Sequence, residues 1–183
     1  MTADRTFDFV GKFPAVFSRS DEATGRIGAA LARFVYPGLL VLLAGDLGTG
    51  KTTLVRAVGA ALGVTNVKSP TFSIEIIYEV HKAHEICQAA KENAPISRLI
   101  HADLYRVADA DEFSEQFEEN LDDGALLMVE WGERWNNAPA SDRWDIAISQ
   151  AGDDLRILEM SAYGERALAV LSRAYSEVLD ACR

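Results

Sequence analysis

Two apolar runs without a polar interruption mark the centre of the predicted fold. The first, Leu39 to Ala44, reads LLVLLA, and the second lies within residues 124–131, GALLMVEW, and ends in an acid. Strands buried on both faces of a parallel sheet have this composition, because neither face meets water. The two runs therefore predict two central strands of such a sheet.

Shorter periodicities predict the strands around this centre. The stretch 71–80, TFSIEIIYEV, alternates apolar and mostly polar residues, which predicts a strand with one solvent-facing side, and RLIHADLY at 98–105 again has strand character. A short first strand is expected at Phe7 to Val10. Apolar residues alternate over 144–148, and strand character returns at 155–161 after the turn-like QAGDD, which predicts an antiparallel C-terminal pair.

Helical stripes of apolar residues separate these strands. The first helix is expected to begin at Ser20 and to end before Pro37, the second to end at Gly63, and the third to begin with the capping-box spacing of Asp109 and Glu112. A fourth helix closes the chain. The apolar positions at helical intervals are Ala23, Ile27, Ala30, Leu31 and Phe34; Leu54, Val55, Val58, Ala61 and Leu62; Phe113, Phe117 and Leu121; and Leu168, Leu171, Ala174, Val178 and Leu179.

Composition limits the class of protein. The 183 residues are 49% hydrophobic and 25% charged, which is enough apolar material for a single domain over residues 1–183. The net charge of −10 argues against binding DNA or RNA by broad neutralisation of phosphates, so any contact with RNA would be local or arranged by partners. Two cysteines cannot form a disulfide framework, and neither a signal peptide nor a membrane span is evident. We therefore expect a soluble, cytoplasmic protein.

The stretch GDLGTGKTT joins the first apolar run to the second helix and fits the phosphate-loop pattern G-x-x-x-x-G-K-[ST]. Its glycines carry no Cβ and can take positive φ, so successive backbone N–H groups can close around a polyphosphate, toward which the next helix directs its positive end. A glycine-rich turn that matches by chance is the alternative, but the flanking strand and helix favour phosphate binding. The candidate binding residues are Gly45, Asp46, Leu47, Gly48, Thr49, Gly50, Lys51, Thr52 and Thr53.

Hydrolysis of a bound nucleotide needs further groups. Lys51 would place a charge on the β and γ phosphates, and Thr52 would offer its hydroxyl to Mg²⁺. Glu130 ends LLMVE and Asp103 ends LIHAD, at the carboxyl ends of predicted strands, where open α/β sheets bind ligands. Either acid can hold Mg²⁺, directly or through water, while the other orients a water molecule. For each acid, capping of the next element is the alternative role.

Two further signals concern the nucleotide. The SPT stretch ending at Thr71 stands where nucleotide switches carry a mobile threonine that senses the γ-phosphate, although Pro70 can also serve only to end the loop. Arg106 and Arg134 follow the two acids and are candidates either for stabilising developing charge or for surface salt bridges. Because no N-K-x-D stretch occurs, guanine specificity is unsupported and ATP is the better candidate.

GDLGTGKTT, SPTF, HADLYR and EWGER, in this order, resemble the TsaE (formerly YjeE) family of bacterial ATPases in tRNA threonylcarbamoyladenosine synthesis. The resemblance covers residues 22–134. It implies a P-loop NTPase-like three-layer α/β fold, with a mostly parallel central sheet, an antiparallel C-terminal pair and helices on both faces. It also implies slow, Mg²⁺-dependent ATP hydrolysis by a protein docked on TsaB-like and TsaD-like partners, which contacts tRNA only through that complex.

The resemblance also implies roles for individual residues. Lys51 and Thr52 correspond to the phosphate and Mg²⁺ residues, Thr71 to the switch threonine, Asp103 to the water-orienting acid and Glu130 to a Mg²⁺ ligand. By the same resemblance, Trp131 is expected at the nucleotide or the partner face, and Thr24 near the adenine.

One segment departs from the family pattern. Residues 81–97 are mixed and polar, and they are longer than expected between the threonine loop and HADLYR, which suggests an insertion with a short helix. Two other functions stay open from the residues alone. One is a small-molecule kinase built on the same loop, and the other is a nucleotide-gated interaction protein with negligible hydrolysis.

Overall fold

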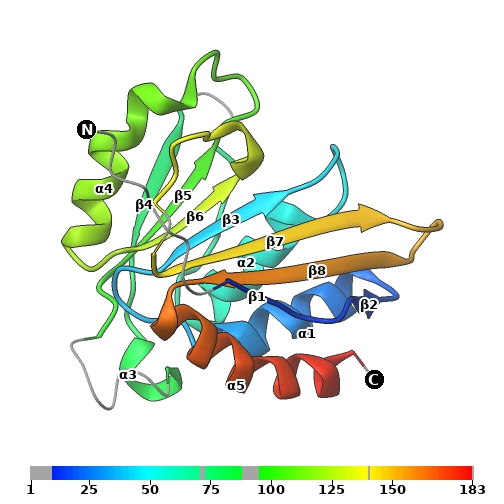
Figure 1. The fold of residues 1–183 in the computed structure, drawn as a ribbon. Coiled ribbons are helices and arrows are strands. Elements are labelled where there is room, and N and C mark those ends of the chain that lie inside the picture. The colour runs from blue at the N-terminus through cyan, green and yellow to red at the C-terminus, as the bar shows by residue number, and fades with distance from the viewer. Residues whose placement is uncertain (1–9, 71–72, 88–94, 140, 183) are drawn as a thin grey trace.

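The computed structural model describes residues 10–70, 73–87, 95–139 and 141–182, and within them the chain forms an eight-stranded sheet (Figure 1). The strand order is β1-β8-β7-β3-β6-β5-β4, and β2 pairs with β8 beside this path. The strands are β1 Val10–Lys12, β2 Val16–Ser18, β3 Leu40–Ala44, β4 Glu75–Glu79, β5 Arg98–Asp103, β6 Leu126–Glu130, β7 Arg143–Gln150 and β8 Arg156–Tyr163.

The centre of the sheet is parallel. Strand β3 pairs in parallel with β6 and β7, and β5 pairs in parallel with β6. The predicted antiparallel C-terminal pair is confirmed as β7 and β8. Antiparallel pairing also extends to β4, which lies beside β5, and to the two short N-terminal strands, which lie beside β8. Of the predicted strand at Phe7 to Val10, only Val10 belongs to the described residues, and it begins β1.

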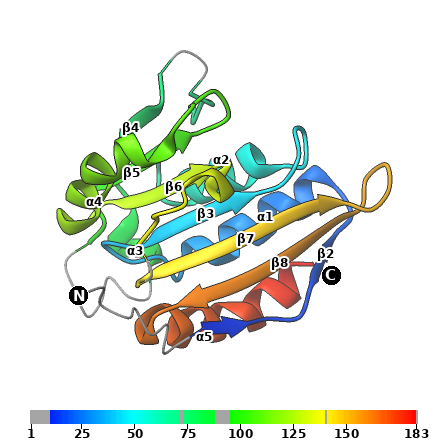
Figure 2. The same ribbon diagram turned by 45° about the horizontal axis from the view of Figure 1, so that its top comes forward.

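Helices cover both faces of the sheet, as predicted. Figure 2 shows α1, α2 and α5 on one side, and α4 packs on the opposite side against β6. Successive residues of β3 alternate between the two cores, since Val41 and Leu43 join the α1–α2–α5 side while Leu40 and Leu42 join the α4 side. The helices are α1 Asp21–Ala32, α2 Lys51–Ala61, α3 Ala83–Ile86, α4 Ser114–Asp122 and α5 Glu165–Ala181, with 3₁₀ turns at Ala110–Phe113 and Gly132–Arg134.

The helix starts agree in part with the sequence signals. The Ser20 side chain accepts a hydrogen bond from the Ala23 amide at 3.1 Å, which confirms the predicted cap of α1. The Asp109 carboxylate instead accepts from the Asp111 amide at 3.0 Å, so a 3₁₀ turn forms first and α4 begins only at Ser114.

None of the described helices combines the length and the hydropathy needed to span a bilayer.

The segment 81–97 is described at 81–87 and 95–97, and it contains α3 as its short helix. Ala83, Cys87 and Ile96 are buried in the core on the α1–α2 side. The described part of this segment is therefore attached to the fold by apolar contacts, in addition to its polar residues.

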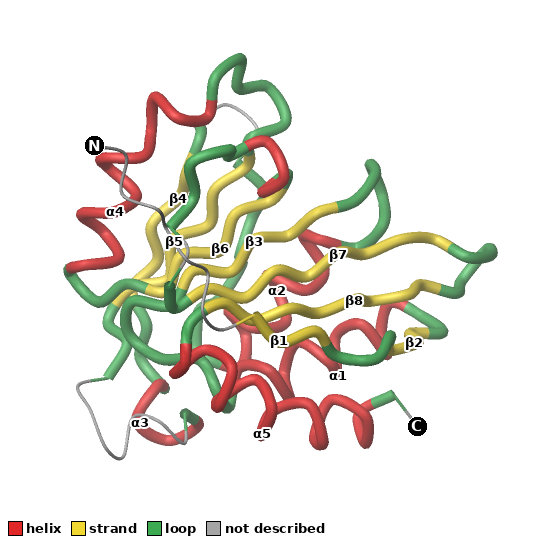
Figure 3. The backbone as a smooth tube through the Cα atoms, in the orientation of Figure 1, coloured by secondary structure: helices red, strands yellow, loops and turns green. Residues whose placement is uncertain are grey.

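Parallel pairing brings three strand ends to one edge of the sheet. Asp103 at the end of β5 is the register partner of Glu130 at the end of β6, and Leu43 of β3 is the partner of Glu130 on its other side. Figure 3 shows the loops that follow β3 and β5 leaving the sheet at this edge. The phosphate loop and both candidate acids thus converge here.

Candidate functional site

The loop between β3 and α2 is held in a conformation that requires glycine. Gly45, Gly48 and Gly50 have φ of +131°, +82° and +106°. A Cβ at Gly45 would lie 2.1 Å from the carbonyl oxygen of Ile148 on β7, so this position has no room for a side chain. Thr49 closes the loop by donating from its hydroxyl to the Asp46 carbonyl at 3.0 Å. The backbone therefore curves around the start of α2, as an anion-binding loop does.

Lys51, the first residue of α2, reaches back into this curve. Its Nζ donates to the carbonyl oxygens of Gly45 at 2.6 Å and Asp46 at 2.8 Å, and it lies 4.2 Å from the centre of the Trp131 ring. Burial lowers the pKa of the Lys51 ammonium, while nearby carboxylates, with Glu130 first among them, oppose that shift. A phosphate in the loop would supply further negative charge to this buried cation.

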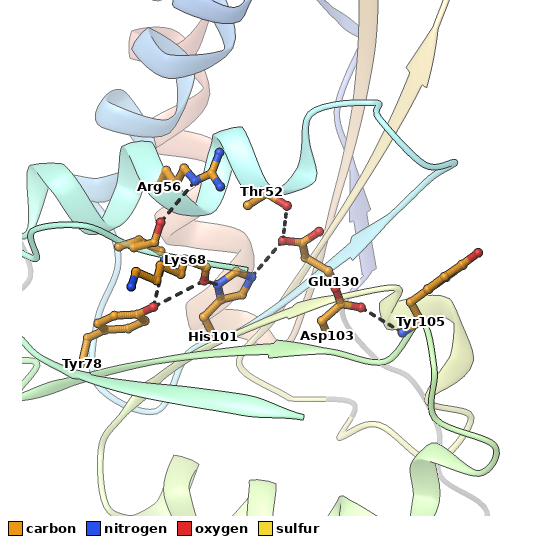
Figure 4. A network of polar contacts seen from close by, with 9 residues as sticks. Thr52, Arg56, Lys68, Tyr78, His101, Asp103, Tyr105 and Glu130 are labelled. Carbon is orange, nitrogen blue, oxygen red and sulfur yellow. Dashed lines mark hydrogen bonds and ion pairs between the residues drawn. The ribbon is translucent and has the colours of Figure 1, made fainter. Parts of the chain in front are cut away.

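The candidate metal carboxylate is bound on two sides (Figure 4). The Thr52 hydroxyl donates to Glu130 Oε1 at 2.6 Å, and Nε2 of His101 lies 2.8 Å from the same oxygen. The Glu130 residue is 4% exposed, so its orientation is set by these protein contacts. Neither contact uses Oε2, and Thr52 donates its only proton to Glu130, so the lone pairs of its hydroxyl stay free to bind a cation.

The second acid lies on the neighbouring strand. Asp103 is partly buried, and its Oδ1 accepts a hydrogen bond from the Tyr105 amide at 2.9 Å, which fixes the carboxylate at the end of β5. The Tyr105 ring packs on the Trp131 ring with 4.9 Å between their centres. Trp131 itself has φ of +59°, an uncommon backbone conformation for a bulky residue, and this turns the chain sharply after Glu130.

These groups line one hollow of about 210 Å³. The predicted residues that line it are Leu47, Gly48, Gly50, Lys51, Thr52, Thr53, Asp103, Glu130 and Trp131, and Ser69 and Tyr105 complete it. A neighbouring hollow of about 630 Å³ shares Leu47, Ser69, Asp103 and Tyr105 with it. Leu47, at the tip of the loop, is 78% exposed and lies at the boundary of both.

The oxygen groups suit Mg²⁺ bound together with a phosphate. Thr52 and Glu130 are in contact, and Asp103 lines the same hollow. In the described part of the chain, no group of three or more His, Cys, Asp or Glu side chains could hold a metal ion. Mg²⁺ in nucleotide sites usually needs only one or two carboxylates, because phosphate and water supply the other ligands. The residues present therefore fit Mg²⁺ with a nucleotide and do not form an all-protein metal cage.

Four predicted residues within the described ranges do not line this hollow: Gly45, Asp46 and Thr49, which belong to the loop itself, and Thr24. Thr24 is fully buried below the loop, where its hydroxyl bonds to Ser18 Oγ at 2.8 Å and its methyl group lies 3.8 Å from the position of a Cβ on Gly50. Thr71 lies outside the described residues. Their proposed roles, at the adenine and as the switch threonine, stay predictions.

Other residues at the site were not anticipated. His101 is fully buried and contacts Glu130, and Arg156 of β8 packs its Nε 3.3 Å from the position of a Cβ on Gly50 while its Nη2 lies 2.7 Å from Asp21. Arg134, by contrast, was a candidate from the sequence for stabilising developing charge or for a surface salt bridge; it donates to the carbonyl oxygens of Leu104 and Tyr105, so it supports the loop after β5. A single polar residue inside the otherwise buried LIHA run was the available signal for His101, since a buried imidazole needs partners.

The strand–loop–helix unit and the acids on adjacent parallel strands define a P-loop NTPase-like α/β protein. Residues 18–158 match the family model described as threonylcarbamoyl adenosine biosynthesis protein TsaE. The chain belongs to the TsaE family.

Individual relatives agree with the family model. The tRNA threonylcarbamoyladenosine biosynthesis protein TsaE of Bacillus subtilis is 34% identical over 146 residues, which cover 79% of this chain and 83% of the relative. Its counterpart in Streptomyces coelicolor is 35% identical and covers 76% of this chain and 90% of its own. The crystal structure of YdiB from Bacillus subtilis superposes with a TM-score of 0.66 and 27% identity, over 92% of this chain and 97% of that one.

Proposed function

We propose that the protein is a Mg²⁺-dependent ATPase that acts on a complex of TsaB-like and TsaD-like proteins during threonylcarbamoyl modification of a tRNA adenosine next to the anticodon. The observation that carries the proposal is the 2.6 Å bond from Thr52 to Glu130, beside Lys51 in the phosphate loop. Family membership supports the pathway, since the relatives are named for tRNA threonylcarbamoyladenosine biosynthesis.

The chain's own residues divide the task. The backbone amides of the loop and the start of α2 would bind the phosphates, and Lys51 would exchange its carbonyl contacts for phosphate oxygens. Thr52 and Glu130 would hold Mg²⁺, which neutralises charge on the phosphates when bound. The Tyr105 amide bonds to Oδ1 of Asp103 and not to Oδ2. Oδ2 can therefore accept a proton from an attacking water.

ATP is the proposed nucleotide, because the chain has no N-K-x-D stretch to recognise guanine. The net charge of −10 supports delegating contact with tRNA to the partner proteins, since a strongly acidic protein is repelled by nucleic acid. The product of the ATPase step would then be a conformational change in the assembly.

Phosphate release tests the proposal. The purified protein with ATP and Mg²⁺ should turn over slowly, and turnover should rise when TsaB-like and TsaD-like proteins are added. Reconstitution with tRNA should make modification depend on ATP hydrolysis by this chain. Unchanged turnover in the mixture would contradict the proposal, and labelled phosphate on a metabolite would indicate a kinase instead.

Asp103→Asn provides a matched variant for the hydrolytic step. Asparagine keeps an oxygen that accepts from the Tyr105 amide, so the loop geometry should persist while the negative charge is lost. ATP binding should stay within about twofold, and turnover should fall by about 100-fold or more, the usual contribution of a positioned base. A wild-type rate in this variant would remove the assigned role of Asp103.

A further inference from the structure

The two ring nitrogens of His101 connect two different parts of the molecule. Nδ1 lies 3.0 Å from the carbonyl oxygen of Lys68, and Nε2 lies 2.8 Å from Oε1 of Glu130 (Figure 4). Lys68 belongs to the segment that runs from α2 to β4, three residues before Thr71. The imidazole therefore spans the distance between the candidate metal carboxylate and the backbone of this segment.

The hydrogen-bond chemistry makes this a directed link. A carbonyl oxygen can only accept, so Nδ1 carries a proton and donates it to Lys68. Nε2 makes the second contact, with Oε1 of Glu130. The imidazole is fully buried, so water cannot replace either of its two partners. If either partner moved, the ring would have to follow or leave a buried polar atom without a hydrogen bond, which is costly.

The segment on the far side of His101 has two further anchors. The Lys68 amide donates to the Tyr78 hydroxyl at 2.9 Å, and Arg56 of α2 donates to the Val67 carbonyl at 3.2 Å. The Tyr78 hydroxyl also lies 3.4 Å from the Lys68 carbonyl oxygen that His101 contacts, but it makes no hydrogen bond to Glu130, so its removal leaves both contacts of His101 available. Ser69, the next residue, lines the hollow of the phosphate loop.

We propose that His101 is a positioning residue that couples Mg²⁺ binding at Thr52 and Glu130 to the backbone of residues 67–69. This inference rests on the proposed function, because it requires a nucleotide and Mg²⁺ at the loop. The ring holds the Glu130 carboxylate in the orientation in which it would bind Mg²⁺. When Mg²⁺ binding shifts that carboxylate, the ring moves with it and shifts the Lys68 carbonyl. The segment that lines the nucleotide hollow thereby responds to whether the metal is present.

Two substitutions by amide side chains separate the contact of His101 with Lys68 from its contact with Glu130. His101→Asn places its side-chain nitrogen near the position of Nδ1, so it can bond to Lys68 but cannot reach Glu130. His101→Gln extends to the position of Nε2, so it can donate to Glu130 but not to Lys68 at the same time. Tyr78→Phe is the matched control, because it removes the other anchor of Lys68 and leaves the His101 link intact.

Two measurements are needed for each protein. The first is the Mg²⁺ concentration that half-saturates binding of a non-hydrolysable ATP analogue. The second is hydrogen–deuterium exchange of a peptide that contains the Lys68 amide, with the analogue present and with or without Mg²⁺. In the wild-type protein, Mg²⁺ should slow exchange in this peptide.

The variants should differ in a defined pattern. His101→Asn should raise the half-saturating Mg²⁺ concentration by about 10- to 100-fold, the range found when groups that orient metal ligands are removed, and Mg²⁺ at saturation should no longer change exchange at Lys68. His101→Gln should keep Mg²⁺ binding within about threefold by preserving the contact with Glu130, and it should still lose the exchange response. Tyr78→Phe should exchange faster throughout, with unchanged Mg²⁺ binding.

The outcomes distinguish this inference from the proposed function. If the wild-type protein binds no nucleotide with Mg²⁺, both are refuted. If the wild-type protein responds to Mg²⁺ and His101→Asn binds Mg²⁺ equally well, only the role of His101 is refuted. An exchange response that survives in His101→Gln would also overturn the coupling, and this variant serves if His101→Asn fails to fold.

Discussion

Replacing Gly45 by Ala should distort the phosphate loop and destabilise the whole fold. The new Cβ would lie 2.1 Å from the Ile148 carbonyl oxygen, whereas real Cβ atoms essentially never come within 3.0 Å of such a neighbour. Both atoms belong to backbone, so the loop or β7 must move by about 1 Å, and overpacking of this kind costs about 1–3 kcal/mol. A positive φ adds about 1–2 kcal/mol for an L-residue. The expected loss in the free energy of unfolding is therefore about 2–5 kcal/mol.

Gly48→Ala is the matched control for this substitution. Gly48 has φ of +82°, but a Cβ there would meet no atom within 4 Å, so only the conformational cost of about 1–2 kcal/mol applies. Both variants lose the same backbone freedom in the unfolded chain, and that contribution cancels in the comparison.

Urea unfolding followed by circular dichroism, without nucleotide, measures the difference. With a denaturant slope of about 2 kcal/mol per molar, the midpoint of Gly45→Ala should lie about 0.5–1.5 M below that of Gly48→Ala. Equal midpoints would refute the conclusion that contact with β7 sets the shape of the loop. Retention of wild-type nucleotide affinity by Gly45→Ala would show that phosphate binding does not depend on that shape.

Four further outcomes are expected. Lys51→Met should lower ATP affinity by about 10- to 100-fold, because a charged hydrogen bond contributes about 1.5–3 kcal/mol, and isothermal titration calorimetry measures this; wild-type affinity would refute the assignment. Nucleotide binding should change the tryptophan fluorescence through Trp131, because the centre of its ring lies 4.2 Å from Lys51 Nζ. The change should vanish in Trp131→Phe, since the buried Trp135 and Trp144 should keep the same emission. A fluorescence change that persists in Trp131→Phe would contradict this. Burial raises the pKa of the Cys87 thiol to about 11 and also raises the pKa of the Cys182 thiol, but Cys87 is the more deeply buried of the two, so a thiol reagent at pH 8 should label Cys182 first. Mass spectrometry that shows the reverse order would contradict the burial of Cys87. Phe117→Ala should lose about 3–5 kcal/mol of stability by emptying the core between Phe113 and Trp135, with ATP affinity kept within about twofold, and a loss below 1 kcal/mol would contradict that packing.

Local sequence signals were sufficient for the strand, the phosphate loop and the helix that follows it. The apolar run before Gly45, the fixed Lys51 and Thr52, and the helical stripe ended by Gly63 all lie within 25 consecutive residues or so, and each has its own backbone rationale. The acids were predictable for a related reason. Parallel strands expose their carboxyl ends at one edge, so an acid that ends such a strand is expected beside the loop.

Contacts between distant segments were not predictable in this way. His101 lies in a strand buried on both faces, where apolar neighbours on either side hide which side the imidazole faces, and its partners Lys68 and Glu130 are separated from it by about 30 residues each. The pairing of Arg156 with Asp21 spans most of the chain.

The backbone conformation of Trp131 and the short strand β2 were also missed, whereas the strand predicted at Phe7 to Val10 meets the described β1 only at Val10. Nothing in the residue type of Trp131 indicates a positive φ, since bulky side chains rarely adopt it, and the surrounding fold must enforce it. Strands β1 and β2 have three residues each, too few to establish a period, and their position beside β8 depends on pairing with the opposite end of the chain.

The place of β6 between β3 and β5 bears on how the protein is made. During synthesis, β5 leaves the ribosome before β6 exists, so it cannot join the strand that precedes the phosphate loop. A nascent chain that ends before Leu126 therefore contains the loop and Asp103 without the pairing that unites them, and without Glu130. The metal-assisted nucleotide binding proposed above therefore requires that β6 has been inserted between β3 and β5.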